Sequence, residues 1–199
     1  GQPLFLPSLP GFDSLGSLKM ILDTGFDYSW FITTQKIVKK EFALSGSEQN
    51  PDFADKSWVK VVQQRILNKA ATPAVEAFKE HGGNFVVAQT LPELIAKMNG
   101  MEGNDLLSPD KIEAEIKARD MQVDNNFSKD AQIMAIHAAR NYRGDKLQRT
   151  AKLHKILDPA NGPLIGVKLN IITRKTLGGL HTNLDSQMIG ADGAPVPGL

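Results

Sequence analysis

Apolar residues recur with a helical period through the middle of this chain. Trp58, Val62 and Ile66 lie four residues apart, which predicts one apolar stripe along a helix. Other helices are predicted from residues that cap helix starts, such as Ser or Thr before Pro, and from glycines that end them. These predicted helices run from Ser14 to a stop at Gly25, from Thr72 to Gly82, from Thr90 to Gly100, over residues 108–123 and from Ser128 to Gly144.

Two of these helices carry further local signals. Thr90 and Glu93 have the spacing of a capping box, and in the 108–123 helix Ile112, Ile116 and Met121 are predicted to point inward. The segment "TTQKIVKKEFALSG" is compatible with either helix or loop.

Short strands are predicted where aromatic and β-branched residues cluster. "YSWFIT" from Tyr28 and "NFVVAQ" from Asn84 have this composition, and the chain becomes β-rich beyond Lys155. The sequence therefore predicts an α+β fold, with a mostly helical part and a small sheet followed by a β-rich C-terminal tail. The predicted division places residues 1–155 in one unit, with 1–13 as an extended arm, and residues 156–199 in the tail.

Composition narrows the class of protein without indicating an activity. The chain has 199 residues, a formal net charge of +1 and no cysteine. The balanced charge gives no reason to expect nucleic-acid binding, and no apolar run is long enough to predict a membrane span. The absence of disulfides fits a reducing compartment, so a cytoplasmic location is expected.

Common catalytic motifs are absent from the sequence. It contains no dinucleotide-binding glycine fingerprint, P-loop, zinc-binding H-E-x-x-H motif or G-x-S-x-G elbow. His81, His137 and His154 are not spaced as metal ligands, and each is expected to be structural or on the surface. No metal site is predicted, and His181 is the stronger candidate for a role in a site.

The last 26 residues, "RKTLGGLHTNLDSQMIGADGAPVPGL", contain the richest pattern. Gly178 and Gly179 lack a Cβ and would let the backbone pass close to a flat ligand, while Arg174 and Lys175 could bind an oxyanion or carboxylate. Residue chemistry alone favours the alternative interpretation, a hairpin with a glycine bulge and exposed basic side chains.

This segment resembles the flavoprotein family of fumarate reductase, succinate dehydrogenase and 3-ketosteroid dehydrogenase. Thr176, Gly178 and Gly179 match that family's T-x-G-G segment, and residues 193–199 match its G-x-P-(I/V)-P-G-L stretch. The stretches "DYSWFITTQKIVKKEFALSGSEQNPD" and "DNNFSKDAQIMAIHAARNYRGD" also look like the subgroup of FAD-binding dehydrogenases, so the resemblance covers most of the chain.

The resemblance implies a Rossmann-type FAD domain interrupted by a substrate-binding cap domain. The chain would then be a fragment, comprising the cap and the segment that returns to an FAD domain outside this sequence. FAD is the implied cofactor of the full-length protein and is not expected to bind to the fragment alone, which would be inactive. The implied reaction is hydride exchange between flavin and a carbon pair activated by a carbonyl or carboxylate.

The resemblance also suggests site residues. Arg174 is the expected catalytic residue, the expected substrate contacts are Arg174, Thr176, Tyr28 and His181, and Gly178 and Gly179 are expected at the cofactor. Arg174 and Lys175 occupy the positions of the His-His pair of fumarate reductases, and no arginine precedes Arg65, which argues against a fumarate-type mechanism. The substrate class stays open at this point.

Two other functions stay open beside the flavoprotein one. The chain could be a free-standing α+β binding module without flavin, or a cofactor-free enzyme that uses His181 and a carboxylate. The expected partners are a small-molecule substrate and the protein's own FAD-binding domain. Neither nucleic acid nor a membrane span is expected. If the chain is a fragment, the surface that would pack on the FAD domain is exposed, and a homo-oligomer could form through the β-rich tail.

Overall fold

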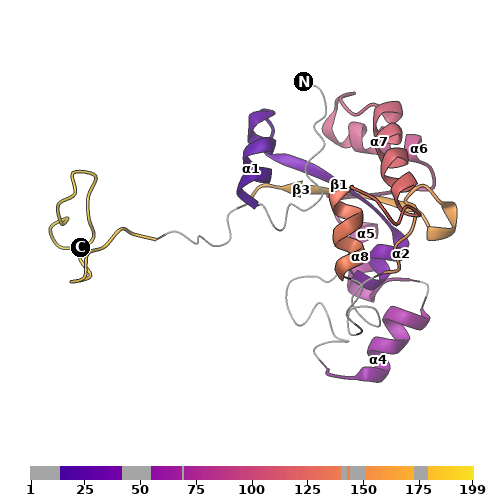
Figure 1. Ribbon diagram of the computed structural model, residues 1–199, viewed down its shortest axis with the longest axis horizontal. Helices are drawn as coiled ribbons and strands as arrows, with labels where there is room; N and C mark the ends of the chain where they lie inside the picture. The colour runs from indigo at the N-terminus through magenta and orange to yellow at the C-terminus, as the bar shows by residue number, and fades with distance from the viewer. Residues whose placement is uncertain (1–13, 42–54, 69, 140–142, 144–150, 173–178) are drawn as a thin grey trace.

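A small antiparallel sheet organises the body of the protein. The computed structural model describes residues 14–41, 55–68, 70–139, 143, 151–172 and 179–199 (Figure 1). Within them, β1 (Tyr28–Thr34), β3 (Leu164–Asn170) and β2 (Phe85–Ala88) form one sheet in the order β1-β3-β2. Both pairings are antiparallel, and β3 therefore joins two strands that come much earlier in the chain.

Helices pack on both faces of this sheet. One face carries Leu164 together with Trp30 and Ile32, and it packs on α6 (Leu91–Glu102) and α7 (Pro109–Gln122). The opposite face carries Ile165 and Val167, and it packs on α2 (Gln35–Glu41) and α5 (Pro73–His81). Figure 1 shows α6 and α7 on one side of the sheet and α2 and α5 on the other. Because alternate residues of β3 point to opposite faces, one strand contributes to both cores.

Gly166 allows α6 to lie close to the central strand. A Cβ at this position would be 2.9 Å from Cγ2 of Val86 and 3.2 Å from Sδ of Met98. The side chain of Met98 is fully buried, so the space over Gly166 is filled by the helix side chain. A glycine in this strand is therefore required by packing and not by backbone conformation.

Most of the predicted helix starts are confirmed. The helix α1 (Ser14–Asp23) is followed by Gly25 at φ 82°, and α5 follows Thr72 and ends before Gly82. The Thr90 hydroxyl accepts a hydrogen bond from the Glu93 N–H, as the capping box predicts. The segment "TTQKIVKKEFALSG", which the sequence assigned to neither helix nor loop, contains α2. The signal at Thr90 succeeds because the cap satisfies a backbone donor within its own turn, whereas Thr72 makes no side-chain capping hydrogen bond and α5 starts with Pro73 at its first position.

Three predictions about helix ends and faces are wrong. The helix α6 continues through Gly100 to Glu102 and stops at Gly103, whose φ of 63° supplies the left-handed cap. In α7, Met121 is 69% exposed, whereas Ile112 is buried as predicted. The third error is the apolar stripe from Trp58: α4 (Trp58–Val62) buries Val61, while Trp58 is 66% and Val62 40% exposed.

The sheet crosses the boundary predicted between residues 155 and 156. After a short 3-10 turn at Pro159–Asn161, β3 returns to the centre of the sheet and pairs with β1 and β2. Between α7 and this turn the chain also contains α8 (Ala131–Ala139), which lies within the predicted 128–144 helix. Gly144, the predicted end of that helix, lies outside the described residues.

Residues 179–199 form a loosely paired turn segment. Isolated bridges join Thr182 to Met188 and Ile189 to Pro195. Asp192 and Gly193 form a turn, where φ of Gly193 is 79° and the Gly190 N–H donates to the Ala194 carbonyl over 2.9 Å. In Figure 1 this segment stands apart from the sheet.

Candidate functional site

A group of polar side chains surrounds Tyr28, where β1 begins. Lys168 of β3 lies on the same sheet face as Tyr28, and its Nζ is 4.3 Å from the centroid of the Tyr28 ring. The same Nζ is 2.7 Å from Oε1 of Glu102, the last residue of α6. Asn104, just past the end of α6, makes a hydrogen bond with the Tyr28 phenol, and the Phe26 ring packs edge-on against Tyr28 at 5.4 Å. We call Tyr28, Glu102, Asn104 and Lys168 the Tyr28 cluster.

The electrostatics of this cluster keep the phenol protonated. Burial is the largest cause that raises the pKa of Tyr28, and the negative charge of Glu102 raises it further. The hydrogen bond from Asn104 and the positive charge of Lys168 act in the opposite direction but do not overcome these effects. Tyr28 is therefore a neutral hydrogen-bonding group throughout the physiological pH range.

The Tyr28 cluster lies where β3 leads toward the glycine-rich tail. Tyr28 is in register with Asn170, and the Ile171 N–H donates to the Asp27 carbonyl over 2.8 Å. The chain therefore passes beside the start of β1 immediately before it reaches the segment that contains Arg174. The sheet thus brings Tyr28 beside Asn170, although about 140 residues of sequence separate them.

The remaining predicted site residues are only partly described. Arg174, Thr176 and Gly178 lie outside the described residues. A Cβ added to Gly179 would have no other atom within 4 Å. His181 is exposed, and its carbonyl accepts a hydrogen bond from the Ile189 N–H over 2.7 Å. Their predicted roles at substrate and cofactor stay predictions.

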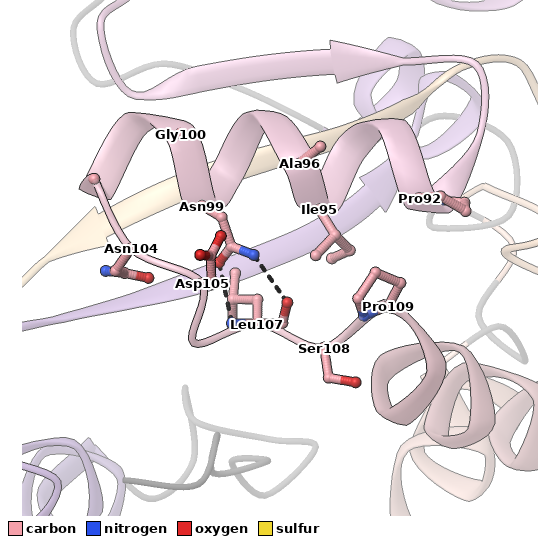
Figure 2. A pocket seen from close by; sticks show the side chains of 11 residues that line it. Pro92, Ile95, Ala96, Asn99, Gly100, Asn104, Asp105, Leu107, Ser108 and Pro109 are labelled. Atoms are coloured by element: carbon pink, nitrogen blue, oxygen red, sulfur yellow. Dashed lines mark hydrogen bonds between the residues drawn. The ribbon is translucent and has the colours of Figure 1, made fainter.

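A hollow of about 590 Å³ lies between α6 and the loop that leads to α7 (Figure 2). The Asn99 side chain closes this loop onto the helix: its amide donates to the Leu107 carbonyl over 2.9 Å and its oxygen accepts from the Leu107 N–H over 3.0 Å. Asn104 lines the hollow and also contacts Tyr28, so the hollow adjoins the Tyr28 cluster. Its wall is mainly apolar, and its lining includes Pro92, Ile95, Ala96, Leu107 and Pro109.

Sequence analysis missed Glu102, Asn104 and Lys168. One signal was present: Lys168 interrupts the apolar run of "PLIGVKLN" at a position that alternation assigns to the same face as Leu164. A lysine on a core-facing position needs a partner, which the end of α6 supplies. The described residues contain no group of His, Asp and Glu side chains that could hold a metal ion. No helix in the same part of the chain is long and apolar enough to cross a bilayer.

Comparison with known proteins identifies the family. The family model described as FAD binding domain matches residues 13–199, so the chain belongs to this family of FAD-binding flavoproteins. Over all 199 residues it is 49% identical to a KsdD-like steroid dehydrogenase of Mycolicibacterium smegmatis. It is 47% identical to KsdD-like steroid dehydrogenases of two Mycobacterium tuberculosis strains. The chain spans about a third of the length of these relatives, 35% to 36%. No solved structure shows a significant match.

The family resemblance stated from the sequence is thus confirmed, and FAD is the cofactor of the family. The described residues do not by themselves provide a dinucleotide cradle. Such a cradle needs parallel strands joined through a glycine-rich turn and a helix, whereas both strand pairings in the described sheet are antiparallel. The described residues therefore do not fit FAD on their own.

Proposed function

We propose that this chain is the substrate-binding cap, with the return segment, of an FAD-dependent oxidoreductase. In the full-length protein the flavin would accept or donate hydride at a carbon pair next to a carbonyl or carboxylate. The observation that carries the proposal is the match over all 199 residues to KsdD-like steroid dehydrogenases at 47% to 49% identity. Steroid ketones are accordingly the first substrates to test.

The geometry of the sheet supports this division of labour. The start of β1 and the end of β3 lie side by side, so the chain both enters and leaves the sheet at the Tyr28 cluster. Residues that follow α1 and residues that precede Arg174 are therefore close in space. A cap inserted into another domain needs its two connections to be neighbours, and this sheet provides them.

The proposed contribution of the chain is to bind and orient the substrate. Tyr28 offers a neutral phenol, and Arg174 would offer a fixed positive charge with two parallel N–H donors. Both groups suit the oxygen of a carbonyl or carboxylate. Such an oxygen gains negative charge when the neighbouring carbon loses a proton, so these donors would stabilise the reacting form.

The proposal is tested with the full-length protein and with the 199-residue chain. The full-length protein is expected to show flavin absorbance near about 450 nm and to reduce a dye in the presence of a 3-ketosteroid. The isolated chain is expected to bind no flavin and to show no turnover. Full-length protein that purifies without flavin under conditions that load related enzymes would contradict the proposal.

A variant of Arg174 tests the predicted catalytic residue separately. Arg174→Ala is expected to lower kcat/KM by about 100-fold, because removal of one charge-assisted donor at a developing oxyanion costs about 3 kcal/mol. The control is Lys175→Ala, which removes the neighbouring positive charge. Equal losses in the two variants would show that only the general charge of the segment matters.

A further inference from the structure

We propose that Lys168 and Glu102 are positioning residues that hold the Tyr28 ring in place for substrate. This inference rests on the proposed function, because it assigns the ion pair a role through Tyr28. Neither residue is predicted to touch substrate. The geometry carries the inference, since Lys168 contacts both Tyr28 and Glu102 within a few ångströms.

The ion pair is more buried than an ordinary surface pair. The side chains of Lys168 and Glu102 are 21% and 12% exposed, whereas the Lys117–Glu113 pair of α7 is 61% and 45% exposed. Moving two charges out of water costs free energy unless their geometry is restrained and their contacts are favourable. Lys168 restrains the geometry, because it lies on the central strand and contacts the carboxylate and the ring face at the same time. Its contact with Glu102 Oε1 is an ion pair without hydrogen-bond geometry.

The arrangement joins three parts of the fold around one ring. Lys168 belongs to the central strand, Glu102 to the last turn of α6, and Tyr28 to the first position of an edge strand. Because β1 is an edge strand, its backbone pairs with β3 alone, and the orientation of the Tyr28 ring depends on the side chains around it. A lysine ammonium over the ring face provides such a contact, because the electron-rich face of the ring attracts a cation.

Glu102 also affects the protonation state of the Tyr28 phenol. Its carboxylate lies near the phenol and disfavours the phenolate, while Lys168 favours it. Lys168 therefore both attracts the ring and partly neutralises Glu102. Loss of the lysine would leave Glu102 without its cation beside the phenol, and loss of the glutamate would leave the lysine free to turn away from the ring.

The first experiment follows Tyr28 itself. Full-length protein labelled with fluorotyrosine is titrated by fluorine NMR, with the Tyr28 resonance assigned by its absence in Tyr28→Phe. Lys168→Met is expected to raise the midpoint of the Tyr28 titration, and Glu102→Gln is expected to lower it. Both variants should shift the Tyr28 resonance at neutral pH, whereas the control Lys117→Met should leave it unchanged.

The second experiment measures turnover of a 3-ketosteroid with an artificial electron acceptor. Lys168→Met is expected to raise KM at least about fivefold with a smaller change in kcat, because a misplaced ring weakens substrate binding. Lys168→Arg should restore most of the loss, since the guanidinium also stacks on an aromatic ring. Lys117→Met should behave like the unmodified protein.

The outcomes separate the inference from the proposed function. A Tyr28 resonance and midpoint that do not respond to Lys168→Met or Glu102→Gln would overturn the inference, whatever the activity. Responsive NMR together with unchanged KM in Lys168→Met would also overturn it, because the pair would then be structural only. Absence of flavin or of steroid turnover in the unmodified protein would contradict the proposed function instead.

Discussion

At the scale of single residues, His154 shows how burial selects a protonation state. Its Nδ1 is 2.7 Å from the Lys152 carbonyl, which can only accept, so the ring proton lies on Nδ1. Nε2 is then free to accept from the Thr34 hydroxyl at 2.8 Å. Burial lowers the pKa of His154 most strongly, and Lys36 and Arg119 lower it further. The neutral ring therefore belongs to the folded state.

This protonation state predicts a pH dependence of stability. The pKa of His154 is lower in the folded than in the unfolded chain. The stabilisation of the folded state by the neutral His154 ring is therefore fully present above about pH 6.5 and is lost as the pH falls through the folded-state pKa. Thermal unfolding followed by circular dichroism should show Tm falling below that pH, and His154→Gln should reduce this slope. His81→Gln is the control, because the His81 side chain is 75% exposed. An unchanged slope in His154→Gln would contradict the assignment.

At the scale of elements, the Asp120 carboxylate of α7 binds the backbone of the segment that precedes β3. Asp120 is 7% exposed and accepts hydrogen bonds from the Ile156 and Leu157 N–H groups over 2.9 and 3.0 Å. Arg119 donates to the same carboxylate over 2.7 Å and to the His154 carbonyl over 2.8 Å. The entry of the central strand into the sheet therefore depends on one buried acidic side chain.

Removal of this carboxylate should destabilise the fold. Asp120→Ala leaves the Ile156 and Leu157 N–H groups without their acceptor in a buried place and removes one acceptor of the Arg119 guanidinium, so the free energy of unfolding should fall by about 2–4 kcal/mol. Asp124→Ala is a matched control just beyond the helix: its carboxylate pairs with Lys155 at 2.7 Å, but the two side chains are 73% and 48% exposed. That variant should lose about 0.5 kcal/mol or less in urea unfolding. Similar losses in both variants would contradict the proposed anchoring.

The same element scale shows what the sequence could predict. Thr90 with Glu93 and Gly25 are recognisable because caps and turns act within a few residues. The stripe from Trp58 was wrong because α4 turns the face of Val61 inward, and the π-helical turn at Gln63–Leu67 changes the phase of the side chains only beyond Val62. Gly100 was a poor stop signal, since glycine within a helix costs only about 1 kcal/mol and the left-handed cap comes at Gly103.

The candidate site was harder to predict for a different reason. Tyr28 was suggested by the family resemblance, but its neighbours Glu102 and Lys168 come from elements 74 and 140 residues further along the chain. Only the pairing of β1 with β3, and the packing of α6 over that sheet, brings them together. Local patterns carry no information on such pairings, because the strand register is set by tertiary contacts.

At the scale of the whole molecule, apolar side chains remain exposed at the end of the sheet that holds the Tyr28 cluster, on the opposite face of the sheet. Phe31 and Leu169 lie diagonally on adjacent strands, on the sheet face covered further along by α2 and α5, and are 41% and 48% exposed. Ile172, just after β3, is 82% exposed. Exposed apolar residues that gather near one end of a sheet are typical of a surface that packs against another part of the protein. Under the proposed function, that part is the remainder of the flavoprotein.

Serine substitutions on this surface should affect the full-length protein and the isolated chain in opposite ways. Phe31→Ser combined with Leu169→Ser should lower the Tm and the flavin content of the full-length protein, because each apolar side chain buried between domains contributes about 1.5–3 kcal/mol. In the 199-residue chain the same change should reduce self-association in size-exclusion chromatography, since less apolar surface is left exposed. The control, Phe127→Ser with Met134→Ser, replaces residues that are 91% and 55% exposed on other elements. If the two double variants lower the flavin content equally, Phe31 and Leu169 do not lie in the surface between the domains, because substitutions in that surface should have a larger effect than substitutions outside it.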